Sequence, residues 1–222
     1  MCGRFVFRKT QEDLDHWGHW ATPGCVDRPR YNIAPGQRVQ ALVFDQLQGR
    51  VSLKWLHWGM KLQSGATCIN LRSETVHCKP MFTDLFAARR CILLADGFYE
   101  WQSIGRYKQP VLFQQRGHSL FGLAGIWDER QGVVGDPKPT CLILTTKANP
   151  MVAKIHSRMP VILEPNQFES WLRKPTNELS PDWNSPLAEN KMTLHPVRPW
   201  VNKVEIDQPG CIEPYDSEQL QF

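Results

Sequence analysis

Residues 91–95 (CILLA), 110–115 (PVLFQQ), 120–127 (LFGLAGIW) and 141–146 (CLILTT) form four short apolar runs in the second half of the chain. Turn signals such as Gly117 stand between them. Apolar runs of roughly four to eight residues bounded by turns are typical of buried strands, whereas buried helices are longer. These runs therefore predict the centre of a β-sheet.

The rest of the chain adds strands and short helices around this centre. Alternating apolar residues predict strands at 38–44 (RVQALVF) and 51–58 (VSLKWLHW), joined by a turn at Gly49. Weaker patterns predict strands at 159–163, 192–197 and 200–204, helices at 10–20, 83–89, 150–155 and 165–172, and loops at 23–36, 59–67 and 173–191. Short strands with interspersed short helices predict an α+β fold, mostly an antiparallel sheet or open barrel with peripheral helices.

A chain of 222 residues can form a single domain with a substantial core. We assign residues 1–206 to that domain and residues 207–222 to a polar C-terminal tail. The net charge of +4 permits a nucleic-acid partner without requiring one. No apolar run approaches the roughly 20 residues of a membrane span, and the amino terminus lacks a secretory signal. We expect a cytoplasmic protein, nucleoid-associated if bacterial, without a membrane partner.

The seven cysteines form an odd set without a CxxC pair. In a reducing compartment this pattern indicates small buried hydrophobic residues rather than disulfides, especially for Cys91 and Cys141 in their apolar runs. His16 and His19 stand near Cys25, but no second ligand pair follows at zinc-finger spacing. No Gly-rich phosphate loop follows a strand. The sequence therefore predicts no metal site and no cofactor.

Cys2 becomes the amino-terminal residue once Met1 is removed, as usually happens before a small residue. Its amine and thiol then stand on adjacent carbons. The amine, with an ordinary pKa of about 7.7–8.0, is partly neutral at cellular pH and can attack an aldehyde to give an imine. The thiol can then close a five-membered thiazolidine, and ring closure gains from being intramolecular. The alternative is a cysteine placed by chance at a frayed chain end.

Residues around Cys2 and four polar clusters support the first interpretation. Arg4 is placed to hold a phosphate and to lower the thiol pKa, and Phe5 to anchor the terminus in the core. The clusters stand at the edges of apolar runs, at 31–36, 69–74, 96–101 and 155–160. Each has an ordinary structural interpretation as a turn, a cap or an ion pair. Together they supply an amide, a carboxylate and an imidazole, the groups that imine chemistry needs.

Four ordered motifs resemble the signature of the SRAP family, the SOS-response-associated peptidase or abasic-site processing proteins. The motifs are Cys2-Gly3-Arg4-Phe5, Asn70-x-Arg72-x-Glu74-Thr75, Asp96-Gly97-Phe98-Tyr99-Glu100-Trp101 and His156-x-Arg158-Met159-Pro160. The similarity extends over about residues 2–206, nearly the whole chain. This resemblance implies a compact β-rich domain with a positively charged groove for single-stranded DNA, and a thiazolidine link between the terminal cysteine and the opened sugar of an abasic site.

The resemblance also implies roles for individual residues. Cys2 is the expected nucleophile, Asn70 the group that recognises the abasic sugar, and Glu100 and His156 the carriers of protons. The expected DNA contacts are Arg4, Arg72 and Arg158 at phosphates and Asn32 and Pro35 along the pocket. One departure is visible after Gly59, where the family usually has a Leu-Ile-Pro-x-Trp type sequence and this chain reads MKLQS. The missing aromatic bears on any preference for replication-fork junctions.

Three functions stay open at this point. The first is a monomeric enzyme that crosslinks itself to abasic single-stranded DNA, with AP-lyase activity in addition. The second is a thiol peptidase that cleaves at least its own Met1–Cys2 bond, although a generic cysteine protease needs an internal cysteine paired with histidine. The third is a non-covalent single-stranded DNA-binding module, for which the set of Asn70, Glu100 and His156 has no use.

Overall fold

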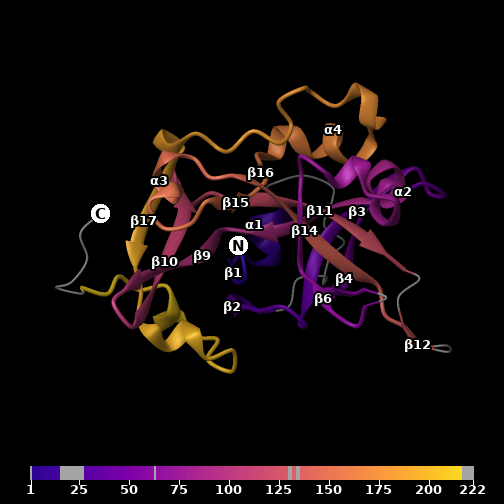
Figure 1. The fold of residues 1–222 in the computed structure, drawn as a ribbon. Coiled ribbons are helices and arrows are strands. Elements are labelled where there is room, and N and C mark those ends of the chain that lie inside the picture. The colour runs from indigo at the N-terminus through magenta and orange to yellow at the C-terminus, as the bar shows by residue number, and fades with distance from the viewer. Residues whose placement is uncertain (1, 16–27, 63, 130–131, 134–135, 217–222) are drawn as a thin grey trace.

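The computed structural model describes residues 2–15, 28–62, 64–129, 132–133 and 136–216 (Figure 1). Strands dominate these residues and form two large sheets, with short helices around them. Most strand pairs are antiparallel, so the predicted α+β fold is confirmed.

The first large sheet contains a closed ring of five strands. β14 pairs with β4, β4 with β3, β3 with β8, and β8 with β11, and β11 returns to β14. The ring strands are β3 (Arg38–Asp45), β4 (Arg50–Trp58), β8 (Arg90–Ala95), β11 (Phe121–Asp128) and β14 (Thr140–Lys147). At its edges lie β7 (Asn70–Arg72), β15 (Arg158–Pro160) and β16 (Ile162–Leu163). In the described part of this sheet, only β4 and the edge strand β7 run parallel to their partner β14.

Gly125 explains why the strands close into a ring, whereas the sequence predicted a sheet or an open barrel. β11 pairs with β16 near Gly122 and changes to β14 from Gly125 onward. A Cβ atom on Gly125 would lie 2.7 Å from the backbone oxygen of Leu142 in β14. The missing side chain therefore lets β14 approach β11 closely enough to complete the ring.

The second large sheet is fully antiparallel and has the order β17-β10-β9-β1-β2. Its strands are β1 (Phe5–Phe7), β2 (Arg30–Ile33), β9 (Gly97–Ile104), β10 (Tyr107–Gln115) and β17 (Met192–Pro196). Two small sheets pair β5 (Met60–Lys61) with β6 (Thr67–Cys68) and β12 (Gly132–Val133) with β13 (Asp136–Pro137).

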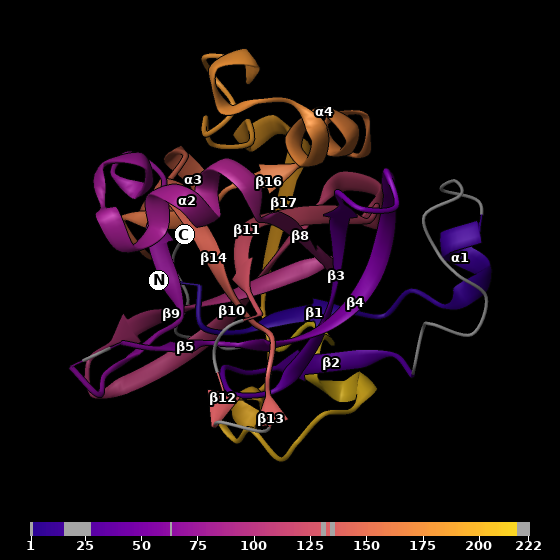
Figure 2. The same cartoon turned by 90° about the vertical axis from the view of Figure 1, so that its right-hand side faces the viewer.

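In the part of the chain that the structure describes, four short α-helices lie around the sheets: α1 (Gln11–Asp15), α2 (Pro80–Ala88), α3 (Pro150–Ala153) and α4 (Phe168–Arg173). Single 3-10 turns occupy Val76–Cys78, Arg116–His118, Pro165–Gln167, Thr176–Glu178, Glu189–Lys191, Pro199–Asn202 and Pro209–Cys211. α2 and α4 pack on β8 and cover one end of the ring (Figure 2). Within the described ranges, no helix combines the length and the apolar character needed to cross a membrane.

Several predicted elements differ from the structure, among them the predicted loop 59–67, which contains strand β5 and the first residue of β6. The predicted loop 23–36 contains strand β2, because the backbone N–H groups of Tyr31 and Asn32 bind the distant Asp207 and the strand pairs with β1. The predicted strand at 200–204 is wrong, since Pro199 begins a 3-10 turn there. The predicted helix at 10–20 is described only to residue 15, and residues 16–27, with both histidines and Cys25, lie outside the described residues.

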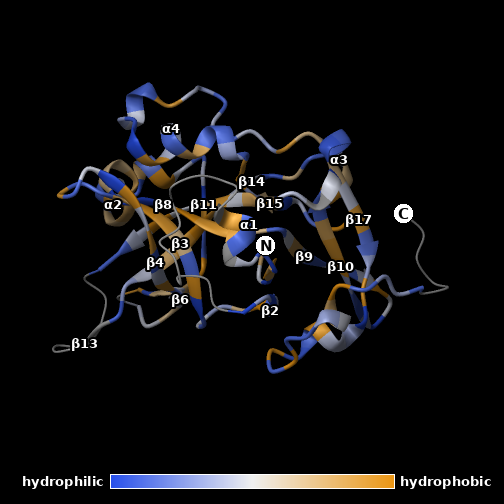
Figure 3. Cartoon of the chain, turned by 180° about the vertical axis from the view of Figure 1, so that it is seen from behind, coloured by the Kyte–Doolittle hydropathy of each residue, from blue (hydrophilic) through white to orange (hydrophobic). Residues whose placement is uncertain are grey.

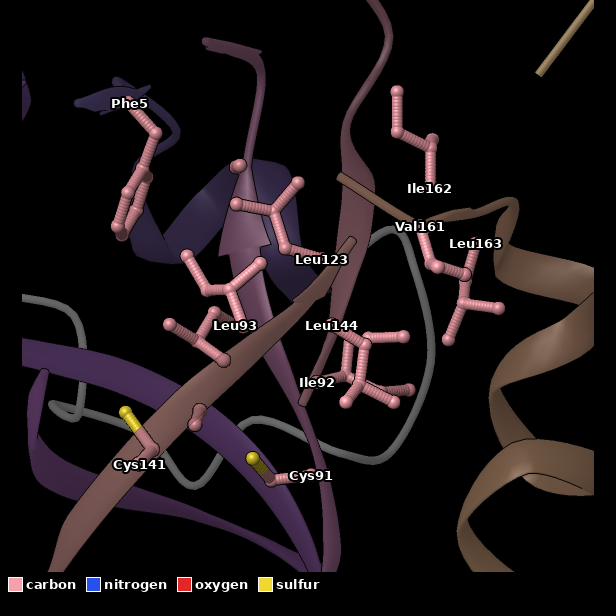
Figure 4. Packing of buried hydrophobic residues seen from close by; sticks show 14 of the residues in the cluster. Phe5, Cys91, Ile92, Leu93, Leu123, Cys141, Leu144, Val161, Ile162 and Leu163 are labelled. Atoms are coloured by element: carbon pink, nitrogen blue, oxygen red, sulfur yellow. The ribbon is translucent and has the colours of Figure 1, made fainter. Parts of the chain in front are cut away.

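The core fills the ring and the space between the two sheets. Figure 3 shows apolar residues concentrated on the strands in the middle of the molecule, and Figure 4 shows Leu93 and Leu123 pointing toward one another, with Leu144 beside Ile92. Cys91 and Cys141 are fully buried among them as free thiols, as the sequence predicted. The four apolar runs in the second half of the chain therefore lie at the centre of the fold.

Candidate active site

Cys2 lies in a fixed position because the strand that follows it is part of the second sheet. β1 pairs with β2 on one side and β9 on the other (Figure 1). Phe5 is buried and packs on Trp58 with ring centroids 5.3 Å apart. Burial of one such phenylalanine stabilises a structure by about 1.5–3 kcal/mol, which opposes fraying of the chain end. Cys2 itself is fully buried, so this segment is not the frayed end of the alternative interpretation.

Asn70 lies directly against Cys2. It begins β7, which runs parallel to β14 at the edge of the ring. Its side-chain Nδ2 donates a hydrogen bond of 2.8 Å to the backbone oxygen of Cys2. Among the described residues, its buried Oδ1 has no hydrogen-bond partner. An acceptor held next to Cys2 in this way is available to a hydroxyl group of a bound molecule.

Glu100 is buried on the same side of β9 as Phe98, with 3% of its surface exposed. Burial raises the pKa of the Glu100 carboxyl above its ordinary value, and the nearby His156 opposes that shift only in part. Tyr99 and Trp101 do not cause the burial, because alternation along the strand turns both toward a separate cluster around Val201. The raised pKa therefore comes from burial on the Phe98 face of β9 and not from the aromatic neighbours in sequence.

His156 stands opposite Glu100, between α3 and β15. Asn149 caps α3 by accepting from the N–H of Val152, whose carbonyl in turn accepts from the N–H of His156. The imidazole Nδ1 lies 3.9 Å from Glu100 Oε1 and accepts a 2.9 Å bond from the N–H of Arg158. Nδ1 also lies 3.1 Å from the backbone oxygen of Arg158, so it accepts from the amide in one tautomer and donates to the carbonyl in the other.

The Cys2 thiol shares this environment. Burial raises the pKa of the Cys2 thiol well above its usual value, and the negative charge of Glu100 adds to the shift. The lower thiol pKa that the sequence led us to expect beside Arg4 is therefore wrong. A neutral thiol next to a carboxyl of raised pKa can give up its proton locally, without a standing thiolate. Cys2, Asn70, Glu100 and His156 thus meet from four separate parts of the chain.

The three predicted phosphate-binding arginines have different surroundings. Arg72 is exposed at the end of β7. Arg158 makes a bidentate ion pair with Glu74, at 2.5 and 2.8 Å, and also donates to the backbone oxygen of Thr145. This pair lowers the pKa of Glu74 to about 2, chiefly through the hydrogen bonds from Arg158. Arg158 therefore joins the turn after β7 to β15, which is the ion-pair interpretation left open for these two clusters.

Asn32 and Pro35 were predicted to line the pocket, and Asn32 does not have the exposure this requires. It is fully buried, and its side chain accepts from Arg4 Nη1 at 3.1 Å and donates to the backbone oxygens of Lys203 and Ile206. Pro35 is half-buried after β2. Asp207, placed by the sequence in the tail, binds the backbone of β2 at Tyr31 and Asn32. No local pattern signals this contact, because its partners lie about 175 residues away.

Comparison with known proteins gives consistent results. Residues 1–204 match the family described as SOS response associated peptidase (SRAP). The chain is 32% identical to abasic site processing protein YoqW of Bacillus subtilis, over 96% of this chain and 99% of that protein. It is 31% identical to abasic site processing protein YedK of Escherichia coli, over 96% and 100%. The relative from Gallus gallus, abasic site processing protein HMCES, is 37% identical over 66% of this chain and half of its own.

Solved structures confirm the architecture. A crystal structure of a protein from Bacteroides thetaiotaomicron superimposes with a TM-score of 0.80 at 22% identity, covering 96% of this chain and all of the other. At that level of identity the likeness concerns the fold alone. The order of strands around the site is therefore shared with an experimentally determined structure.

Proposed function

The chain belongs to the SOS response associated peptidase (SRAP) family, and on this premise we propose that it processes abasic sites in single-stranded DNA by a covalent bond at Cys2. The observation that carries the proposal is the hydrogen bond from the Asn70 side chain to the Cys2 backbone, with the side chains of Glu100 and His156 close by. A cysteine needed only for packing would not require a buried acid, an imidazole and an amide around it.

The reaction forms two bonds at one carbon. The opened sugar of an abasic site presents an aldehyde, which the free Cys2 amine attacks to give a carbinolamine. Loss of water then leaves an imine. The Cys2 sulfur adds to the imine carbon as its proton moves to the imine nitrogen, and a thiazolidine results. Aldehyde and aminothiol thus combine with release of one water, and no oxidant or reductant takes part.

Glu100 and His156 carry the protons in this sequence. Loss of water from the carbinolamine needs an acid, and opening of the sugar ring needs a base at the anomeric hydroxyl. A buried carboxyl of raised pKa keeps its proton to a higher pH than an exposed one, so the protonated form can serve as the acid and the ionised form as the base. The imidazole of His156, which can carry its proton on either ring nitrogen, is the second group that donates or accepts a proton. Asn70 Oδ1 accepts from a sugar hydroxyl and orients the aldehyde toward Cys2.

Crosslinking on denaturing gels tests the proposal. Incubation with single-stranded DNA containing one abasic site should give a band that survives denaturant without borohydride. Cys2→Ala should abolish this band, because alanine keeps the amine but cannot close the thiazolidine. Cys78→Ala, which removes an exposed thiol, is the matched control and should crosslink normally. A denaturant-stable adduct of Cys2→Ala without reduction would show that the nucleophile is another residue.

The same experiment separates the finer alternatives. We propose that Met1 must be removed first, so an amino-terminal extension that resists cleavage should block the adduct. Mass spectrometry of the terminus in Glu100→Gln tests self-cleavage, since retained Met1 in that variant alone would indicate autopeptidase activity. Strand scission at the abasic site would reveal lyase activity. Comparison of a single strand with a fork of equal length tests the junction preference, which we expect to be weak because the aromatic after Gly59 is missing.

A further inference from the structure

The segment after Val197 forms a loop whose ends meet. An isolated bridge pairs Val197 with Pro214, and the N–H of Tyr215 donates to the backbone oxygen of Pro196. We name residues 197–214 the C-terminal loop; Figure 1 shows it in yellow below β10 and beside β2. Compact loops with closed ends hold their shape through their own contacts and are frequently functional. This loop extends beyond residue 204, where the match to the family ends.

Asp207 seats the loop on β2. Its carboxylate accepts from Tyr31 N at 2.5 Å and from Asn32 N at 3.0 Å, and it forms an ion pair with Arg30. Its side chain is 12% exposed. Charge-assisted bonds to two successive backbone N–H groups fix the loop on this strand.

Asn32 links the C-terminal loop to Arg4 through its side-chain hydrogen bonds. Its Nδ2 donates to the backbone oxygens of Lys203 at 2.9 Å and Ile206 at 2.8 Å, and its Oδ1 accepts from Arg4 Nη1 at 3.1 Å. The loop also contacts Arg4 directly, since Nη1 donates to the backbone oxygen of Val201. One fully buried amide therefore joins the loop to the arginine two residues from Cys2.

Trp101 holds the other side of the Arg4 guanidinium. The guanidinium carbon lies 5.8 Å from the centroid of the indole, whose Nε1 donates to Asn202 Oδ1 in the loop at 2.6 Å. Arg4 is thus held between a buried amide, a loop carbonyl and a ring that the loop itself orients. Its Nη1 donates to two acceptors, and among the described residues the other guanidinium N–H groups make no hydrogen bond, so they can bind a ligand.

We infer that the C-terminal loop is a positioning element for DNA binding, in which Asp207 and Asn32 hold Arg4 in the orientation that receives a phosphate beside the abasic site. The inference rests on the proposed function for the identity of the ligand. Asp207 and Asn32 act through Arg4 and do not touch the DNA. Preorganisation of this kind strengthens binding because the arginine loses less conformational freedom when the phosphate arrives.

The sign of the effect distinguishes this role from simple electrostatics. Removal of an acidic side chain from a DNA-binding protein should strengthen binding when charge alone acts, because one negative charge fewer repels the phosphates. Loss of Asp207 should instead weaken binding, since Arg4 loses its support. Glu213 is an exposed acid of the same loop and gives a matched control with the same change in charge.

Equilibrium binding in a Cys2→Ala background measures this directly, because alanine cannot close the thiazolidine and the probe offers no aldehyde for an imine. The probe is single-stranded DNA with a stable abasic analogue, at fixed salt concentration. Asp207→Ala should raise Kd about tenfold, the scale of one charged hydrogen bond, whereas Glu213→Ala should leave Kd unchanged or lower it. Binding by Asp207→Ala as tight as by Glu213→Ala would overturn the inference. Thermal unfolding checks that each variant is folded, and Asp207→Asn, which keeps one acceptor oxygen, replaces any variant that is not.

A double-mutant cycle with Arg4→Ala tests the route of the effect. If Asp207 acts through Arg4, adding Asp207→Ala to Arg4→Ala should cost little further affinity, because the group that it positions is already gone. Additive losses would show that Asp207 acts elsewhere and would overturn the inference. Crosslinking by the wild-type chain is measured in parallel. Its absence would reject the covalent function, while the binding data would still decide the role of the loop.

Discussion

Glu100 and Glu74 are two carboxylates on either side of the site, and the structure gives them opposite properties. Glu100 is buried beside a histidine, and burial raises its pKa. Glu74 is partly exposed, and its bidentate bond to Arg158 lowers its pKa to about 2. One carboxyl therefore keeps its proton to a higher pH than an ordinary glutamate, while the other stays charged to a lower pH and ties the turn after β7 to β15. The comparison teaches that the partner of a carboxylate, rather than its place in a motif, decides its function.

The largest expected effect follows from the proton-carrying role of Glu100. Glu100→Gln keeps the shape of the side chain but cannot exchange a proton, so crosslinking should slow by about 10²-fold or more. A time course with abasic single-stranded DNA between pH 5.5 and 8.5 measures this. Release of DNA from the adduct should slow as well, because the same groups act in reverse. Wild-type rates in Glu100→Gln would contradict the assignment.

His156→Ala should slow the reaction by a similar factor and should also change its pH dependence. The imidazole is the neighbour that partly counteracts the raised pKa of Glu100. Its removal should therefore shift the limb of the pH–rate profile that Glu100 controls toward higher pH. His195→Ala changes a histidine whose Nε2 bonds the backbone of Ile212, and it serves as the control with an unchanged profile. If the limb does not shift in His156→Ala, His156 does not influence the pKa of Glu100.

Stability should respond in opposite directions to the same substitution at the two sites. A raised folded-state pKa means that Glu100 contributes stability below its ordinary pKa of 4.5 and loses it as pH rises through the folded value. Glu100→Gln should therefore raise Tm by a few degrees at pH 8, and the gain should shrink toward pH 4. Calorimetry at both pH values measures the difference. A lower Tm at pH 8 would mean that the buried charge is fully compensated.

Glu74→Gln should have the reverse and smaller effect. A lowered pKa means that Glu74 contributes stability above 4.5, which is lost as pH falls from 4.5 to about 2. Partly exposed ion pairs contribute about 0–1 kcal/mol, so Tm should fall by at most about 4 °C at pH 7. The difference from wild type should disappear near pH 2. A difference that is independent of pH would point to packing rather than to charge.

The smallest effect concerns the arginines. Arg72 is exposed, whereas Arg158 is engaged by Glu74. Each phosphate contact on a single strand contributes about 0.7 to the slope of log affinity against log salt concentration. Arg72→Ala should therefore reduce the steepness of this slope by about 0.7. Arg116→Ala, which removes an arginine bound to the backbone of Asn190, is the control and should leave the slope unchanged.

Much of the fold was predictable because local patterns specify strands. The runs that became β8, β10, β11 and β14 were identified within one or a few residues of their ends. β2 was missed since Pro35 and Gly36 beside it signal a loop, and the bonds that fix it come from distant Asp207. The motifs also predicted which four residues meet at the site. They did not predict that Asn32 is buried or that Glu74 engages Arg158.

The sequence by itself determined the chemical groups available to this protein: a thiol at position 2, an amide, a carboxyl and an imidazole, in motifs that resemble those of one family. These are properties of residue type and order, which the chain carries before it folds. Only the tertiary structure decided which carboxyl is buried, which arginine is engaged and what holds Arg4. Burial and charge pairing depend on residues brought together from distant parts of the chain, and pKa and binding geometry follow from that environment.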